Sequence, residues 1–155
     1  MPKESFTRKA SDNPYLHKDF HIALNYGIDY LHKKFGEEAV REYLVQFANA
    51  YFSPLKKTIK ENGLRAIREH YVKIYEIEGA EYDTSLSQDE LIITLFASPA
   101  VLHMNTNGHS VSPLFHETVT TVNKEICINT PFECEVLEYK HENGAYRLHF
   151  SRRTI

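Results

Sequence analysis

The sequence predicts an α+β fold in which N-terminal helices and a helical insertion pack on an antiparallel sheet of about four strands. In the first half of the chain, apolar residues recur every three or four positions, which is the spacing of amphipathic helices. In two later regions they alternate with polar residues, as in strands. The pair Asn143-Gly144 lies between two alternating segments and is a strong signal for a hairpin turn. Because the predicted strands come in pairs, we expect the sheet to be antiparallel.

Glycine and proline divide the first half of the chain into helical segments. Each segment carries one apolar stripe, which is expected to face the core. The predicted helices cover 18–35, 37–51, 54–62 and 64–79. Before them, residues 1–13 are charged and polar and are predicted to form a flexible leader, so that residues 14–155 make up a single domain.

The second half of the chain changes from helical spacing to the alternation of strands. The predicted strands cover 82–87, 90–97, 132–141 and 145–153. Between the two strand pairs, Ser98-Pro99 ends the preceding strand, and a short helix is expected to follow through His103 and Met104 until Gly108. Ser112-Pro113 marks the start of another helix, because proline is favoured at the first helical position. The helix after Pro113 is predicted to run to about Cys127.

The composition is that of an ordinary soluble globular protein. The chain has 155 residues, of which 42% are hydrophobic and 25% are charged. A net charge of −3 argues against nucleic acid as a partner, because phosphate binding needs a basic surface. No apolar run approaches the roughly 18 residues of a membrane span, and the polar N-terminus is not a secretory signal. With only Cys127 and Cys134 available, a disulfide framework is not expected, and the sequence predicts a cytoplasmic protein.

Familiar cofactor-binding and catalytic motifs do not occur in the sequence, so no cofactor is expected. His17, His21 and Asn25 are spaced by four and share one side of the first helix, with His17 just before its first turn. Two histidines at this spacing can bind a metal ion, but nothing specifies a third ligand. A polar helix face is the simpler interpretation, and no metal is predicted.

Short polar side chains mark the helix after Pro113 as a candidate pocket wall. His116, Thr120 and Asn123 recur at spacings of four and three, and Glu117 belongs to the adjoining row. Threonine and asparagine suit a pocket wall better than an exposed face, where lysine and glutamate are common. The alternative is that both rows face solvent. In a pocket, a histidine beside a carboxylate could act as a general base.

The segment before this helix contains further candidates. Ser98 follows the end of a predicted strand, where loops often carry functional residues. Ser98 with His103 or His116 could form a nucleophile and its base, although spacing alone does not fix that geometry. The stretch from Ser98 to Asn123 is therefore the predicted functional region.

Several short runs along the chain resemble one protein family. They are Asp19-Phe20-His21 with Leu24-Asn25, Phe35-Gly36-Glu37-Glu38-Ala39-Val40-Arg41-Glu42-Tyr43 with Phe47, Pro54-Leu55, Ser98-Pro99-Ala100-Val101 with His103-Met104, and Phe115-His116-Glu117 with Thr121-Val122-Asn123. Together these runs, which extend over 15–153, resemble the L-2-amino-thiazoline-4-carboxylic acid hydrolase family of bacteria. The family name implies that water opens a C–N or C–S bond in a small cyclic amidine-like acid, as a step towards cysteine.

The resemblance implies two groups of site residues. The catalytic candidates are His116, Glu117, His103 and Ser98, and the substrate-binding candidates are His21, Asn25, Thr120 and Asn123. Similar proteins often have cysteine at the positions of Ser98 and His116, and serine is a weaker nucleophile without a dedicated base. A non-catalytic small-molecule-binding or sensor domain that uses the same pocket is therefore the alternative to a hydrolase. A third interpretation is an interaction module whose helical stripes form a homodimer interface.

Overall fold

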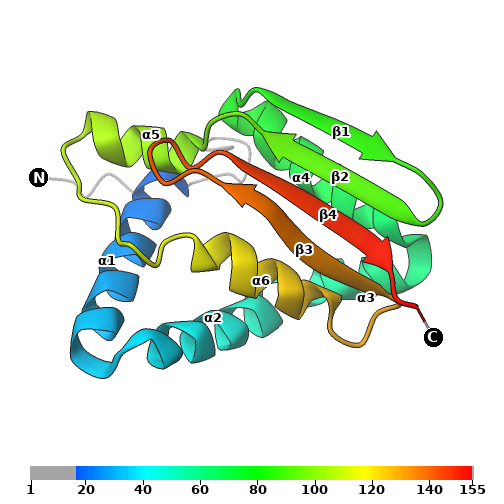
Figure 1. Cartoon of the computed structure of the whole chain (residues 1–155), viewed down its shortest axis with the longest axis horizontal. Coiled ribbons are helices and arrows are strands. Elements are labelled where there is room, and N and C mark those ends of the chain that lie inside the picture. Colours follow the sequence, from blue (N-terminus) through cyan, green and yellow to red (C-terminus); the bar gives the residue numbers. More distant parts are fainter. Residues whose placement is uncertain (1–16, 155) are drawn as a thin grey trace, which may run out of the picture.

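The computed structural model describes the backbone of residues 17–154 and the side chains of residues 19–154, so the predicted leader lies outside the described residues (Figure 1). Two groups of helices alternate with two pairs of strands along the chain. In order, the elements are α1 (His17–Phe35), α2 (Glu37–Tyr51), α3 (Ser53–Asn62), α4 (Leu64–Glu78), β1 (Tyr82–Leu86), β2 (Glu90–Leu95), α5 (Pro99–Thr106), α6 (Glu117–Cys127), β3 (Phe132–Tyr139) and β4 (Tyr146–Arg152). The α+β fold class that the sequence predicts is confirmed.

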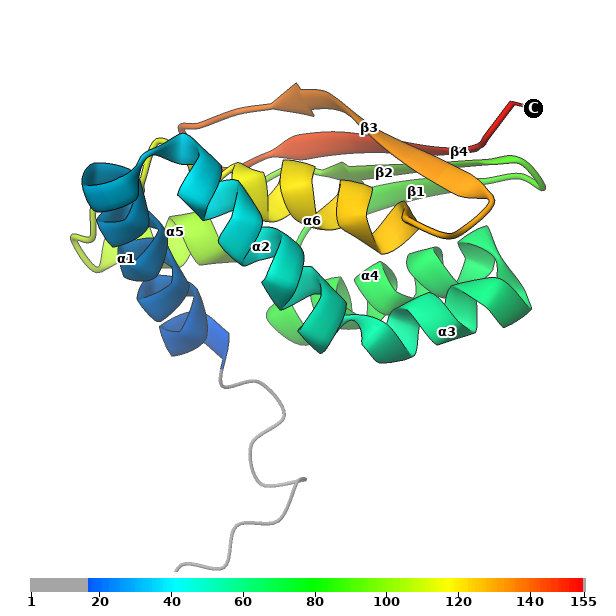
Figure 2. The same ribbon diagram turned by 90° about the horizontal axis from the view of Figure 1, so that it is seen from below.

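The four strands of the described chain form one antiparallel sheet in the order β1-β2-β4-β3. In the central pair, Leu95 of β2 lies opposite Tyr146 of β4, and Leu91 lies opposite Phe150. β3 pairs with the other edge of β4, where Cys134 lies opposite Phe150. The labelled helices all lie on one face of this sheet (Figure 2). The fold therefore has two layers, with the core between them.

The core follows from the alternation of the two central strands. Their inward-facing side chains are fully buried, namely Leu91, Ile93, Leu148 and Phe150. Between Leu148 and Tyr146, Arg147 points to the other face of the sheet and is exposed, because successive side chains of a strand point to opposite faces. This confirms that one face of β4 is buried and the other is solvated.

The predicted hairpin at Asn143-Gly144 is present, but its loop is longer than a two-residue turn. The Lys140 N–H donates to the Ala145 carbonyl oxygen at 2.8 Å and closes the loop. Gly144 has a φ of 68°, in the left-handed region that glycine adopts without steric cost. The loop also packs on the start of α5, because the Ser98 N–H donates to the Asn143 carbonyl oxygen at 2.8 Å.

One helix begins later than the sequence predicts. The prediction places its start at Pro113, whereas α6 begins at Glu117. Residues 113–116 form tight turns instead, in which the Glu117 N–H donates to the Leu114 carbonyl oxygen at 2.9 Å. His116 therefore precedes the helix as its N-cap residue, and its carbonyl oxygen accepts a hydrogen bond from the Thr120 N–H at 3.0 Å.

Candidate functional site

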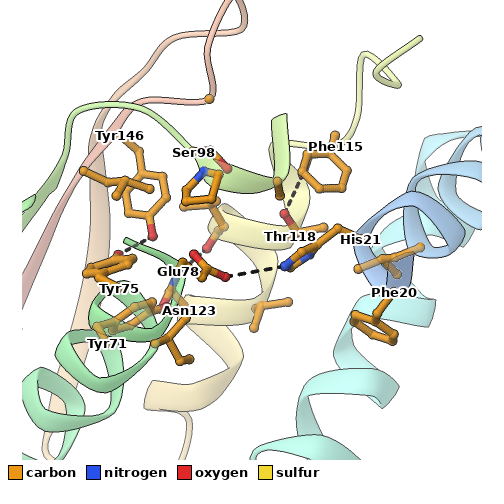
Figure 3. Close-up of a pocket in the computed structure, with 18 of the residues that line it drawn as sticks. Phe20, His21, Tyr71, Tyr75, Glu78, Ser98, Phe115, Thr118, Asn123 and Tyr146 are labelled. Carbon is orange, nitrogen blue, oxygen red and sulfur yellow. Dashed lines mark hydrogen bonds and ion pairs between the residues drawn. The ribbon is translucent and has the colours of Figure 1, made fainter. Parts of the chain in front are cut away.

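A cavity of about 270 Å³ lies between the helical layer and one end of the sheet (Figure 3). Side chains from α1 and α2 line one side, α4 lines the other, and α5, α6 and the ends of β2, β3 and β4 contribute the rest of the lining. Its volume is just below the roughly 300–1,000 Å³ that is typical of small-molecule pockets. The cavity is therefore large enough for a small ligand.

The walls of the cavity are mainly aromatic. Phe20 of α1 stacks on Phe47 of α2 with ring centroids 6.1 Å apart, and Phe47 stacks on Tyr51 at 5.3 Å. On the α4 side, the rings of Tyr71 and Tyr75 lie 5.6 Å apart. Phe20 and Tyr51 are 39% and 53% exposed, so large rings face solvent at the edge of the cavity. Exposed apolar surface of this kind is typical of binding sites.

Two hydrogen-bonded pairs of polar side chains also line the cavity. The Tyr71 hydroxyl donates to Asn123 Oδ1, and the Asn123 amide donates to the Val119 carbonyl oxygen at 2.8 Å. The hydroxyls of Tyr75 and Tyr146 bond to each other. Burial raises the pKa of all three tyrosines above its usual value. These hydroxyls therefore stay protonated near neutral pH.

The cavity contains an acid–base pair as well. Glu78, the last residue of α4, points toward His21 of α1, and its Oε1 lies 3.8 Å from His21 Nε2 (Figure 3). The side chain of Glu78 is 8% exposed and that of His21 is 26% exposed. A carboxylate in such a place is costly unless nearby groups stabilise its charge. The pair is therefore a candidate for ligand binding or proton transfer.

Some of the predicted site residues line this cavity, namely His21, Ser98 and Asn123. Ser98 has a structural role there, because it caps α5 and its Oγ accepts a hydrogen bond from the Val101 N–H at 3.4 Å. The histidines predicted as its base, His103 and His116, are not among the lining residues. The structure therefore does not assemble the nucleophile and base that the sequence suggested.

His116 and Glu117 belong to a separate cluster where α2 packs on α6. The Glu117 carboxylate accepts hydrogen bonds from Arg41 Nε at 3.3 Å and from Thr121 Oγ1 at 2.6 Å. His116 Nε2 lies 3.4 Å from the same carboxylate, and its Nδ1 lies 2.9 Å from the Pro113 carbonyl oxygen. Thr121 lies on α6 with Glu117, whereas Arg41 belongs to α2, so the Arg41–Glu117 hydrogen bond joins the two helices.

The remaining predicted residues also lie outside the cavity. Asn25 is fully buried, donates to the Ser110 carbonyl oxygen at 2.9 Å and accepts from the Ser112 N–H at 2.8 Å. It therefore fixes the loop after α5 to α1. His103 lies on α5 and Thr120 borders a groove beside β3. The side chain of His17, the other member of the histidine pair, lies outside the described side chains.

Glu78 and Tyr75 line the cavity but are not among the residues that the sequence predicted for the site. Ile67, Tyr71 and Tyr75 form one apolar stripe on α4, and Glu78 occupies the next position of the same stripe. Core residues of a helix are rarely followed on the same face by a buried carboxylate. The change from an aromatic side chain at Tyr75 to an acidic one at Glu78 within one stripe is the signal that could have pointed to this site.

The fold and the cavity define a small α+β protein with an aromatic-lined pocket. No protein-family model matches the chain, and no curated protein matches it. Within the part of the chain that the structure describes, histidine, cysteine, aspartate and glutamate do not group in threes that could hold a metal ion. None of the helices between residues 17 and 154 is long and apolar enough to cross a membrane. The functional inference is therefore based on the cavity.

Proposed function

We propose that this protein binds a small, ring-bearing and largely apolar molecule in the cavity between α1, α2 and α4. The observation that supports this function is the aromatic lining of the cavity, from Phe20 and Phe47 on one side to Tyr71 and Tyr75 on the other. Small-molecule sites usually combine apolar and aromatic walls with a few placed polar groups. Stacking on such rings adds to the burial of the ligand's apolar surface.

The tyrosine pair offers a directed hydrogen bond to such a ligand. One bond between the Tyr75 and Tyr146 hydroxyls uses one of their two protons, so the accepting hydroxyl keeps a proton to donate. A ligand oxygen or ring nitrogen beside this pair would accept it. Asn123, by contrast, is engaged with Tyr71 and with the α6 backbone, and we assign it to positioning the Tyr71 ring.

Filling the cavity is expected to abolish binding. Val119 of α6 lines the cavity and is partly buried, so Val119→Trp places an indole in the ligand's volume. We expect the neutral fluorescent probe N-phenyl-1-naphthylamine to bind the native chain with increased emission, and its affinity to fall by about tenfold or more in the variant. A fluorescence titration measures both constants.

A matched substitution controls for the effect of the new tryptophan on folding. Val72 lies on α4, is partly buried and is not among the lining residues, so Val72→Trp is expected to bind the probe like the native chain. Equal binding by native chain and Val119→Trp would show that the probe does not use this cavity. Failure of the probe to bind the native chain would count against the proposed function itself.

Hydrolysis is a second candidate function, favoured by the His21–Glu78 pair. We propose that, with a cyclic amidine-like acid in the cavity, His21 accepts a proton from water as the water oxygen attacks the ring carbon between nitrogen and sulfur. Glu78 stabilises the imidazolium. The C–N or C–S bond then breaks, and the leaving nitrogen or sulfur takes the proton back from His21. This is the chemistry that resemblance to L-2-amino-thiazoline-4-carboxylic acid hydrolases implies.

Replacement of the base tests this candidate. We expect His21→Gln to lower turnover of L-2-amino-thiazoline-4-carboxylic acid by about 100-fold, because general bases typically contribute about 10²–10⁴ in rate. Chromatography follows the loss of the thiazoline ring. His32→Gln, on the same helix but outside the lining, should keep the native rate. A native chain that leaves the ring intact, or a His21→Gln variant of native activity, would reject hydrolysis and leave binding as the function.

A further inference from the structure

We infer that the ligand of this cavity is a phenol, whose hydroxyl group donates a hydrogen bond to the imidazole of His70. The inference rests on the proposed binding function and adds to it a ligand class and a residue that determines specificity. Three observations support it: the accessible nitrogens of His70, the two rings that pack against its imidazole, and the aromatic surface beside it.

His70 lies on α4 and lines the cavity, and it takes no part in the hydrogen-bonded pairs described above. Among the residues that the structure describes, no group forms a hydrogen bond or an ion pair with either of its ring nitrogens. Every fully buried side-chain nitrogen or oxygen of the described residues has a partner, so the two nitrogens of His70 are accessible. His70 therefore offers polar atoms to a ligand in the cavity.

Two aromatic rings pack against the imidazole of His70. The His70 ring meets the Phe52 ring at 80° with centroids 5.5 Å apart, and it meets the Tyr71 ring at the same angle and distance. Tyr71 is itself held by Asn123, to which its hydroxyl donates a hydrogen bond (Figure 3). A side chain held in this way loses little conformational freedom when a ligand binds to it, and this favours affinity.

The imidazole of His70 is suited to accept a hydrogen bond. Burial, together with the nearby charge of Lys73, lowers the pKa of His70, so its ring is neutral near neutral pH. A neutral imidazole has one N–H donor and one nitrogen with a free lone pair, which is an acceptor. The Tyr75–Tyr146 pair offers a ligand a donor, whereas His70 offers it an acceptor. A ligand with an O–H or N–H group therefore gains a partner at His70.

The chemistry of the donor group favours a phenol. A carboxylic acid is ionised near neutral pH and has lost its O–H donor, whereas a phenol, with a pKa near the value of about 10 of tyrosine, keeps its proton. An O–H also forms shorter hydrogen bonds than an N–H does. The phenol hydroxyl is attached directly to an aromatic ring, and the Phe52 ring beside His70 lies 4.9 Å from that of Tyr51, which also lines the cavity. Lysine and arginine do not occur among the described lining residues, so these residues suit a neutral ligand.

Three naphthalenes of similar shape separate the donation of a hydrogen bond from the burial of apolar surface. They are 2-naphthol, which donates and accepts, 2-methoxynaphthalene, which only accepts, and 2-fluoronaphthalene, which has no O–H. Their affinities are measured near neutral pH by displacement of N-phenyl-1-naphthylamine from the native chain. We expect 2-naphthol to bind about fivefold or more tightly than the other two, because one hydrogen bond typically contributes about that factor. Equal affinity of 2-naphthol and either of the others, or failure of all three to displace a bound probe, would overturn the inference while leaving the binding function intact.

Removal of the ring nitrogens then assigns the preference to one side chain. His70→Phe keeps a planar ring, so we expect the preference for 2-naphthol over 2-fluoronaphthalene, compared within this variant, to fall to about twofold or less. His149→Phe makes the same replacement on β4, outside the lining, and should keep the native preference. A native preference retained by His70→Phe would overturn the role of its imidazole. Failure of N-phenyl-1-naphthylamine to bind the native chain would instead count against binding itself.

Discussion

Gly144→Ala is expected to lower the free energy of unfolding by about 2–5 kcal/mol. The residue has a φ of 68°, which costs an L-residue roughly 1–2 kcal/mol. A Cβ at this position would also lie 2.6 Å from Ser98 Cβ and 2.6 Å from Val101 Cγ2. Those atoms belong to the start of α5, so the helix would have to shift to relieve the steric clash. Overpacking of this kind typically costs about 1–3 kcal/mol. The free energy of unfolding of a natural domain is about 5–15 kcal/mol in total, so this loss is a large part of it.

Denaturant unfolding followed by circular dichroism measures this loss. Gly27→Ala is the matched control, because Gly27 lies within α1 and a Cβ there meets nothing within 4 Å. We expect that variant to gain about 0.5–1 kcal/mol, since alanine stabilises a helix interior relative to glycine. Equal stability of the two variants would contradict the contact between the β3–β4 loop and α5. Gly144 also lines the cavity, so Gly144→Ala should weaken binding of the naphthylamine probe.

The helices and strands could be predicted because the signals that define them are local. Glycine and proline stand at the ends of α2, α3 and α4, and between them apolar residues recur every three or four positions. Sheet order is not local, since β2 pairs with β4 across two helices. The predicted start of α6 was wrong, because Pro113 suits a tight turn as well as a first helical turn.

The site could be predicted only in part, because spacing assigns residues to a helix face and not to the neighbour of that face. His21 and Asn25 are four apart on α1, yet His21 lines the cavity and Asn25 holds a loop. Similarly, Asn123 of α6 faces Tyr71, whereas Glu117 faces Arg41 of α2. Which way each residue turns depends on how the helices pack, and that is set by the whole core.

Glu78 was not predicted as a site residue because a charged side chain at a helix end is usually solvated. It ends α4, where charged residues are common, and Gly79 follows it as a cap. A residue of another helix, His21 of α1, lies 3.8 Å from Glu78, and the Glu78 side chain is only 8% exposed. Polar residues at helix ends therefore have to be judged by the layer that covers them, which the sequence alone does not reveal.

Alkaline pH is expected to unfold the protein, because its buried thiols and phenols cannot ionise in the folded state. Burial raises the pKa of Cys127 to about 12 and raises that of Cys134 as well. The cavity tyrosines, Tyr71, Tyr75 and Tyr146, are raised for the same reason. In the unfolded chain these groups ionise near their ordinary values, which are about 8.5 for cysteine and about 10 for tyrosine.

The sign of the effect follows from proton binding. Each group has a higher pKa when folded than when unfolded, so its contribution to stability is complete below the unfolded pKa and is lost as the pH rises above it. Each group then costs about 1.4 kcal/mol per pH unit until its folded pKa is reached. The thiols act first, from about pH 8.5, and the phenols add to the loss from about pH 10. We therefore expect the free energy of unfolding to fall by several kcal/mol between about pH 8 and about pH 10.5.

Denaturant titrations across this range, with tyrosinate absorbance recorded at each pH, measure the fall and identify its source. Replacing Cys127 and Cys134 with alanine should flatten the curve between about pH 8.5 and about pH 9.5 and leave the later fall unchanged, because the phenols remain. The comparison depends on the slope with pH, so a uniform loss of stability in the alanine variant does not affect it. A free energy of unfolding that stays constant to about pH 10.5, or phenols that ionise in the folded chain near pH 10, would contradict the burial of these groups.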